Sequence, residues 1–135
     1  MKKIAVYAIC KNEMKFLPTW WENMSKGVDY ICILDTGSTD GTLEWLTEKR
    51  KEDNRLIWKQ EIVTPWAFDV ARNRSMELVP MDADILVCTD FDEKWLTPNW
   101  AGVLRKAWKK GKTISAMYRF DWRMSEDGVT PIKSF

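Results

Sequence analysis

Two aspartates separated by one apolar residue, Asp90-Phe91-Asp92, follow a strand-like run of apolar residues. Carboxylates at this spacing off a strand end can point the same way, and two nearby anions repel each other unless a cation or a shared proton offsets the repulsion. A hard divalent ion that keeps water ligands and bridges substrate phosphates suits one or two carboxylates. The motif therefore predicts a metal site, and the plainer alternative is an acidic surface turn.

A second polar segment, residues 35–42, joins an apolar run to a helical pattern. Its glycines, with Asp40 or Thr42, are explained by a tight turn and a helix cap. Asp35 is not required by that turn, and a carboxylate at a strand end can accept hydrogen bonds from a pyrimidine N–H or a ribose hydroxyl. The segment lacks the Gly-Lys-Ser/Thr of a P-loop and is not a GxGxxG loop, so we do not expect it to cradle phosphate.

Two further segments carry polar groups that would lie near these motifs. Lys11-Asn12-Glu13 follows the first apolar run, and Arg72 lies in a helical pattern that precedes the fourth. Arg72 is either a solvated helix charge or, if its helix points at the same edge, a contact for a base or a diphosphate, because a guanidinium suits phosphate oxygens.

The elements that must position these residues alternate along the chain. Apolar runs predict strands at 4–10, 30–34, 56–63, 85–89 and 114–120, and amphipathic patterns predict helices at 13–26, 42–52, 68–79 and 98–110. This alternation is typical of a single α/β domain with a mostly parallel sheet flanked by helices. In such sheets ligands bind beyond the carboxyl ends of the strands, so the polar clusters should converge there.

Finer features of these elements can also be predicted. The runs at 30–34 and 85–89 are nearly continuous apolar segments, as in strands covered on both faces, whereas the mixed run at 56–63 indicates a strand nearer an edge. In the last helix we expect an apolar face of Val103, Leu104, Ala107 and Trp108, with Gly111 as its stop.

Composition excludes several classes of protein. The 135 residues include 21 basic and 20 acidic side chains, a net charge of +1, so nothing favours nucleic acid or an anionic membrane as partner. No apolar run reaches the ~18 residues of a membrane span, and the start of the chain lacks a signal-peptide cleavage site, so we expect a cytoplasmic protein.

Cysteine and histidine usage restricts the chemistry further. Cys10, Cys32 and Cys88 lie far apart in apolar runs without zinc-site spacing, and we expect all three to be reduced and buried. The chain has no histidine, which excludes a Ser-His or Cys-His nucleophile within it. Catalysis would have to rest on carboxylates, basic side chains, backbone amides or a hard metal ion.

Four motifs together resemble family 2 glycosyltransferases of the GT-A fold. They are Ile9-Cys10-Lys11-Asn12-Glu13, Leu34 followed by residues 35–42, Phe68-Asp69-Val70-Ala71-Arg72-Asn73 with its spacing shifted before Ala71, and Asp90-Phe91-Asp92-Glu93. They occur in the family's order and at roughly its spacing. The resemblance extends from residue 4 to about residue 120.

The resemblance implies a Rossmann-like GT-A nucleotide-diphospho-sugar transferase fold and a nucleoside-diphosphate sugar donor, most often a UDP-sugar. It places Asp35 on the uracil or ribose and the loop around Ile9 and Glu13 beside the base, with Arg72 and Asp90 on the nucleotide. Asp90 and Asp92 would hold Mn²⁺ or Mg²⁺ on the diphosphate, where the ion acts as a Lewis acid for the departing UDP.

Such enzymes usually transfer a hexose with inversion, and an Asp or Glu base deprotonates the acceptor hydroxyl. The base normally lies well downstream, where this chain offers only Asp121, Glu126 and Asp127, and Ser125-Glu126-Asp127-Gly128 is more typical of a hairpin turn. We therefore name no base, and the acceptor, whether glycan, lipid or protein, stays open.

We also expect that the acceptor-binding half is missing from this chain and that the chain alone transfers sugar poorly. In that event tryptophans such as Trp95, Trp100 or Trp122 would lie exposed and favour self-association.

Two alternatives stay open. Residues 85–95 superficially resemble the first motif of haloacid-dehalogenase-type phosphatases, although Lys94 stands where that motif has Thr or Val. The second alternative is a non-catalytic half-domain that binds a nucleotide or a partner without turnover. Donor hydrolysis would separate this alternative from an enzyme.

Overall fold

The computed structural model describes residues 1–113, 123–124 and 131–133. Its elements are β1 (Ile4–Cys10), α1 (Leu17–Met24), β2 (Tyr30–Asp35), α2 (Thr42–Glu52), β3 (Leu56–Gln60), α3 (Phe68–Met76), β4 (Ile85–Cys88), α4 (Trp100–Ala107), β5 (Arg123–Met124) and β6 (Pro131–Lys133). The first four strands form one parallel sheet in the order β3-β2-β1-β4, and β5 pairs with β6 antiparallel. The α/β class and the parallel sheet are as predicted.

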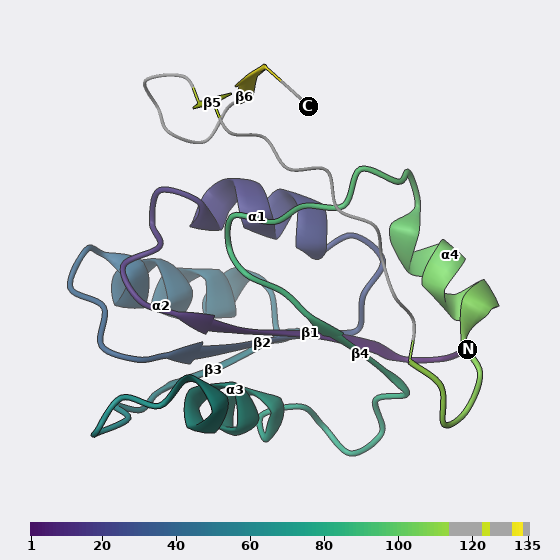
Figure 1. Ribbon diagram of the computed structural model, residues 1–135, viewed down its shortest axis with the longest axis horizontal. Helices are drawn as coiled ribbons and strands as arrows, with labels where there is room; N and C mark the ends of the chain where they lie inside the picture. The colour runs from purple at the N-terminus through teal and green to yellow at the C-terminus, as the bar shows by residue number, and fades with distance from the viewer. Residues whose placement is uncertain (114–122, 125–130, 134–135) are drawn as a thin grey trace.

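Helices cover the parallel sheet on both faces (Figure 1). α1, α2 and α4 lie on one face, and α3 lies on the other, where it packs mainly on β1 and β2. This arrangement follows from right-handed crossovers, because the sheet grows from β1 to β3 in one direction and then returns across β1 to β4. All four strands therefore present their carboxyl ends at one edge.

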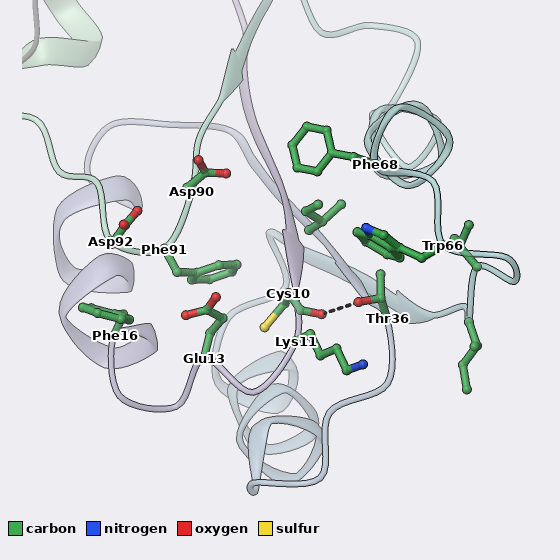
Figure 2. A pocket seen from close by; sticks show the side chains of 13 residues that line it. Cys10, Lys11, Glu13, Phe16, Thr36, Trp66, Phe68, Asp90, Phe91 and Asp92 are labelled. Carbon is green, nitrogen blue, oxygen red and sulfur yellow. Dashed lines mark hydrogen bonds between the residues drawn. The ribbon is translucent and has the colours of Figure 1, made fainter.

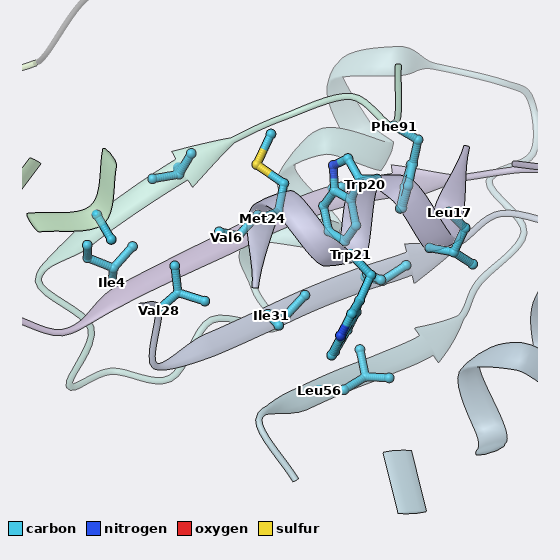
Figure 3. Packing of buried hydrophobic residues seen from close by; sticks show 14 of the residues in the cluster. Ile4, Val6, Leu17, Trp20, Trp21, Met24, Val28, Ile31, Leu56 and Phe91 are labelled. Carbon is cyan, nitrogen blue, oxygen red and sulfur yellow. The ribbon is translucent and has the colours of Figure 1, made fainter. Parts of the chain in front are cut away.

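The larger core lies between the sheet and α1 (Figure 3). The apolar residues of α1 recur at three- and four-residue spacing, so Leu17, Trp20, Trp21 and Met24 all face the strands and are buried. Burying a side chain of this size contributes about 1.5–3 kcal/mol, so α1 is firmly fixed against β1 and β2.

Three helices, α1, α3 and α4, are shorter than the pattern predicts, while α2 has the predicted bounds. α1 begins at Leu17 rather than at residue 13, because the Glu13 carbonyl accepts the N–H groups of Phe16 and Leu17 in a preceding turn. α3 ends at Met76 rather than at residue 79, and tighter turns lead from there to Pro80, which cannot continue a helix.

The prediction for α4 is wrong in part. The helix ends at Ala107, and Gly111 lies in a separate turn beyond it, where Lys112 N–H donates to the Lys109 carbonyl. Its buried residues are Trp100, Ala101 and Leu104, whereas Val103 and Ala107 of the expected apolar face are exposed. The apolar stripe is thus set by the first turn, which packs against α1.

The predicted edge position of β3 is confirmed, whereas the predicted coverage of β4 is not. β3 lies at one edge, as its mixed sequence indicates, but it ends at Gln60. β4 forms the other edge of the described sheet, and the expectation that it is covered on both faces is wrong: Ile85 and Val87 face the core, while Leu86 and Cys88 are exposed. α3 packs over β1 and β2, which leaves this face of β4 open.

Several expectations lie outside the described residues. These are the strand at 114–120, Trp122, and the acids Asp121, Glu126 and Asp127. The antiparallel pairing of β5 with β6 agrees with a hairpin, although its turn also lies outside them. Within the residues described, none of the helices is long and apolar enough to cross a membrane.

Candidate functional site

A cavity of about 600 Å³ opens at the carboxyl ends of the parallel strands (Figure 2). Its lining comes from the end of β1, the start of α3 and the segments that follow the four strands, namely Ile9, Cys10, Lys11, Glu13, Phe16, Thr36, Ile62, Val63, Trp66, Phe68, Asp90, Phe91 and Asp92. Of the residues predicted from sequence, the cavity brings together Ile9, Glu13, Asp90 and Asp92. Asp35 and Arg72 do not line it.

The loops after β1 and β2 are fastened to each other by side chains. Asn12, at a left-handed φ of 55°, donates its N–H to Ser38 Oγ (2.8 Å), and its Oδ1 accepts the N–H of Thr39 (2.7 Å). Met14 N–H donates to Asp40 Oδ2 (3.1 Å). The polar residues of both motifs thus fix the rim of the cavity.

Asp35 is fully buried and its carboxylate is occupied by the protein itself. Oδ1 accepts the backbone N–H groups of Gly37 and Ser38 (both 2.9 Å) and the side-chain N–H of Gln60 (3.1 Å), and Oδ2 accepts the Ser38 hydroxyl. Gln60 is the residue opposite Asp35 in the β2–β3 register, so this side-chain bond joins the ends of two neighbouring strands. Asp35 therefore organises the turn that the glycines permit.

Asp90, Asp92 and Glu13 form the acidic side of the cavity. Between the two aspartates, Phe91 is buried and packs on Trp20 of α1, with ring centroids 4.4 Å apart. Burial raises the pKa of the Glu13 carboxyl, and the negative charges of Asp92 and Asp90 raise it further. The three carboxyl groups thus lie close enough to interact electrostatically. Their mutual repulsion favours binding of a cation at the acidic side of the cavity.

Arg72 holds Asp90 from the neighbouring helix. Its Nη2 lies 2.9 Å from Asp90 Oδ1, its Nη1 donates to the Thr89 carbonyl (3.4 Å), and its guanidinium stacks over the Phe68 ring at 5.0 Å. The Arg72 side chain is 16% exposed and that of Asp90 is 58% exposed, so the pair lies at the border of the cavity. The α3 helix does point this arginine at the strand ends.

The opposite side of the cavity is aromatic and was not predicted as part of the site. Trp66 and Phe68 are 56% and 57% exposed, and Ile62 is 68% exposed. Figure 2 shows both rings across the cavity from Asp90, Asp92 and Glu13. The sequence contains a signal for this wall, since two large aromatics flank the start of α3 in a short segment with Pro65, where core packing does not require them.

The expected exposure of Trp100 is wrong. Trp100 is buried, its indole N–H donates to the Asn23 carbonyl (3.2 Å), and its ring stacks on Trp95 at 5.0 Å. Trp95 is half-buried because it packs against the core, and Asn23 also bonds to its backbone N–H and carbonyl. These two tryptophans connect α1 to α4 and do not form a free surface.

The donor chemistry of the acidic side fits a hard cation that shares its coordination with a ligand. Among the residues that the structure describes, no group of three or more His, Cys, Asp and Glu side chains is gathered closely enough to hold an ion by itself. Two carboxylates with phosphate and water oxygens would complete a set suited to Mg²⁺ or Mn²⁺. Asp90 and Asp92 are the residues that would hold such an ion.

The fold and the cavity define an α/β protein with a mixed acidic and aromatic cleft at the carboxyl edge of a parallel sheet. The chain is similar to a TPR repeat-containing protein of Synechococcus elongatus, with 26% identity over 100 residues. That alignment covers 74% of this chain and 23% of the relative, so the chain spans about a quarter of the relative's length. No family model and no solved structure matches the chain.

Proposed function

We propose that this chain is the nucleotide-sugar-binding part of a GT-A glycosyltransferase, similar to family 2, and that it binds a UDP-sugar with a divalent cation. The observation that carries the proposal is the placement of Asp90, Asp92 and Glu13 at one end of a cavity formed by the carboxyl ends of β1 to β4. Sheets of this type bind nucleotides at that edge.

The donor's diphosphate would lie at the acidic end. Asp90 and Asp92 would hold Mn²⁺ or Mg²⁺, and the bound ion would supply Lewis-acid stabilisation of the departing nucleoside diphosphate. Arg72, which already contacts Asp90, is positioned to reorient toward a phosphate, because its planar fork matches phosphate oxygens as well as carboxylates. Asp35 would support the nucleoside indirectly, by fixing the turn that carries Thr36 into the cavity.

The transfer step would place the acceptor hydroxyl beside the sugar, and an Asp or Glu base would take its proton. We name neither the acceptor nor the base. The proposed site of action is the cytoplasm, with which three cysteines outside any disulfide bond agree.

Calorimetric titration with UDP tests the proposal. We expect binding in the presence of Mn²⁺ that weakens sharply when EDTA is added. Asp90→Asn and Asp92→Asn should each weaken Mn²⁺-dependent binding by roughly tenfold or more, since even outer partners of a metal site contribute that much. Glu44→Gln is the matched control, because Glu44 is an exposed acid on α2 outside the cavity.

Equal UDP affinity with and without metal would remove the metal from the proposal, and absence of UDP binding would refute it. Slow release of sugar from a panel of UDP-sugars, lost in Asp92→Asn, would separate an enzyme from a binding module. Turnover of a simple phosphate monoester, lost in Asp90→Asn, would instead support the phosphatase alternative.

A further inference from the structure

Trp66 differs from the tryptophans that hold the fold together in being exposed and in lying outside the core cluster. Trp20, Trp100 and Trp108 donate their indole N–H groups to Thr89, Asn23 and Asp84, and all three pack in or against the core. Trp66 is 56% exposed, and within the described part of the chain its indole N–H has no protein acceptor. It nevertheless lines the cavity, so its large apolar face is presented to whatever binds there.

The neighbouring aromatic is already engaged. The Arg72 guanidinium stacks over the Phe68 ring at 5.0 Å, and the same guanidinium bonds to Asp90. Phe68 therefore helps to place a charge at the acidic end. For the Trp66 ring, the contacts in the described part of the chain include no stacking partner of this kind.

The position of Trp66 relative to the acidic pair suits a long ligand. Asp90 and Asp92 follow β4, while Trp66 lies between β3 and α3, and β3 and β4 are at opposite edges of the described sheet. A diphosphate near the acids would direct its nucleoside over the ends of β1 and β2 toward Trp66. Asp35 is buried and saturated, so it does not offer the base a free carboxylate there.

We propose that Trp66 is the platform on which the nucleobase of the donor stacks, and that this residue, with Asp35 acting only through the turn, sets the site's affinity for the nucleoside. The inference rests on the proposed function, since it takes a nucleoside diphosphate as the ligand. Every nucleobase has a flat π-face. Stacking an exposed indole on that face is more favourable than leaving both surfaces in contact with water.

The test compares UDP with 5,6-dihydrouridine diphosphate, whose saturated ring is puckered but keeps the same carbonyl and N–H groups. The unaltered protein, with Mn²⁺ present, should bind UDP roughly 5- to 150-fold more tightly than the dihydro analogue, the range expected for one stacked base. Trp66→Ala and Trp66→Leu should lose most of this preference while binding the analogue as the unaltered protein does. Trp66→Phe, which keeps a ring, should retain part of it.

Leu96→Ala is the matched control, because Leu96 is also 56% exposed and lies outside the cavity. Circular dichroism checks that each variant is folded. If the preference for UDP persists in both Trp66→Ala and Trp66→Leu, or if the unaltered protein shows no preference, the stacking role is refuted while nucleotide binding stands. If the unaltered protein binds neither compound, the proposed function itself fails and this inference falls with it.

Discussion

The Arg72 guanidinium lies 2.9 Å from the Asp90 carboxylate, so the first aspartate of the acidic pair already has a cationic partner. A metal ion that binds Asp90 must compete with that partner. Replacing Arg72 removes the competitor without altering either aspartate, which makes the ion pair a direct test of where a metal binds.

For Arg72→Gln we expect Mn²⁺ to bind the nucleotide-free protein about twofold to fivefold more tightly, which corresponds to a partly exposed ion pair. Electron paramagnetic resonance of free Mn²⁺ measures this. Arg74→Gln serves as control, because Arg74 lies on the same helix but pairs with Glu61 and Glu77. Unchanged Mn²⁺ affinity in Arg72→Gln would argue against Asp90 as a ligand.

Asp35→Asn should lower the free energy of unfolding by roughly 2–4 kcal/mol, because a buried carboxylate that accepts several hydrogen bonds is replaced by a group that can accept fewer. Urea denaturation followed by tryptophan fluorescence gives the value. Asp69→Asn, at an exposed position, should change stability little. A fully stable Asp35→Asn protein that no longer binds UDP would instead identify Asp35 as a direct ligand contact.

Ellman's reagent should titrate one thiol quickly in the native protein and all three after denaturation. Cys88 is exposed, whereas burial raises the pKa of Cys10 and of Cys32 to about 12, which keeps both as unreactive thiols at neutral pH. Cys88→Ser should abolish the fast phase. A fast phase that survives this substitution would show that the sheet opens readily at β1 or β2.

The Asp53–Arg55 pair should make the free energy of unfolding depend on pH in the acidic range. Its Arg55 guanidinium holds the pKa of Asp53 below the ordinary value of 3.8, and Arg55 also bonds to the carbonyls of Ser25 and Val28. The stabilisation is complete above about pH 4 and is lost as pH falls below 3.8 through the lowered pKa.

We therefore expect Asp53→Asn to be about 1–2 kcal/mol less stable than the unaltered protein at pH 7, with the difference shrinking below pH 3.8. Chemical denaturation at pH 7, 4 and 2.5 measures it. A difference that is independent of pH would show that Asp53 acts through packing and not through its charge.

Local patterns were enough to predict most of the elements. The bounds of α2 and the edge position of β3 are confirmed, because a charged helix with one apolar stripe and a mixed strand each carry their own signal. The prediction that the strand Ile85–Cys88 is covered on both faces was wrong, since a strand with one exposed face can have the same apolar sequence as a fully covered one. What covers a face depends on where α3 crosses, which no local pattern records.

The site was harder to predict than the fold. Sequence motifs drew attention to the acidic pair that lines the cavity, but they did not distinguish a carboxylate that faces the cavity from one that holds a turn, as Asp35 does. That distinction depends on whether Gln60 and Ser38 occupy the oxygens, which follows from strand register. Trp66 lies just before the Phe68–Asn73 motif and was not predicted as part of the wall, because its place there depends on its exposure, which no local pattern records.

Phe91 has a consequence for the thermodynamics of binding. This residue lies between Asp90 and Asp92 in sequence, and its ring is buried and packs on Trp20, whose indole N–H donates to Thr89 (3.4 Å). The acidic turn is therefore immobilised when the domain folds, and a ligand that arrives there does not have to supply the conformational entropy of ordering it. Trimming Trp20 to a smaller apolar residue would transfer that entropic penalty from folding to association, so affinity would fall although every residue that lines the cavity is unchanged.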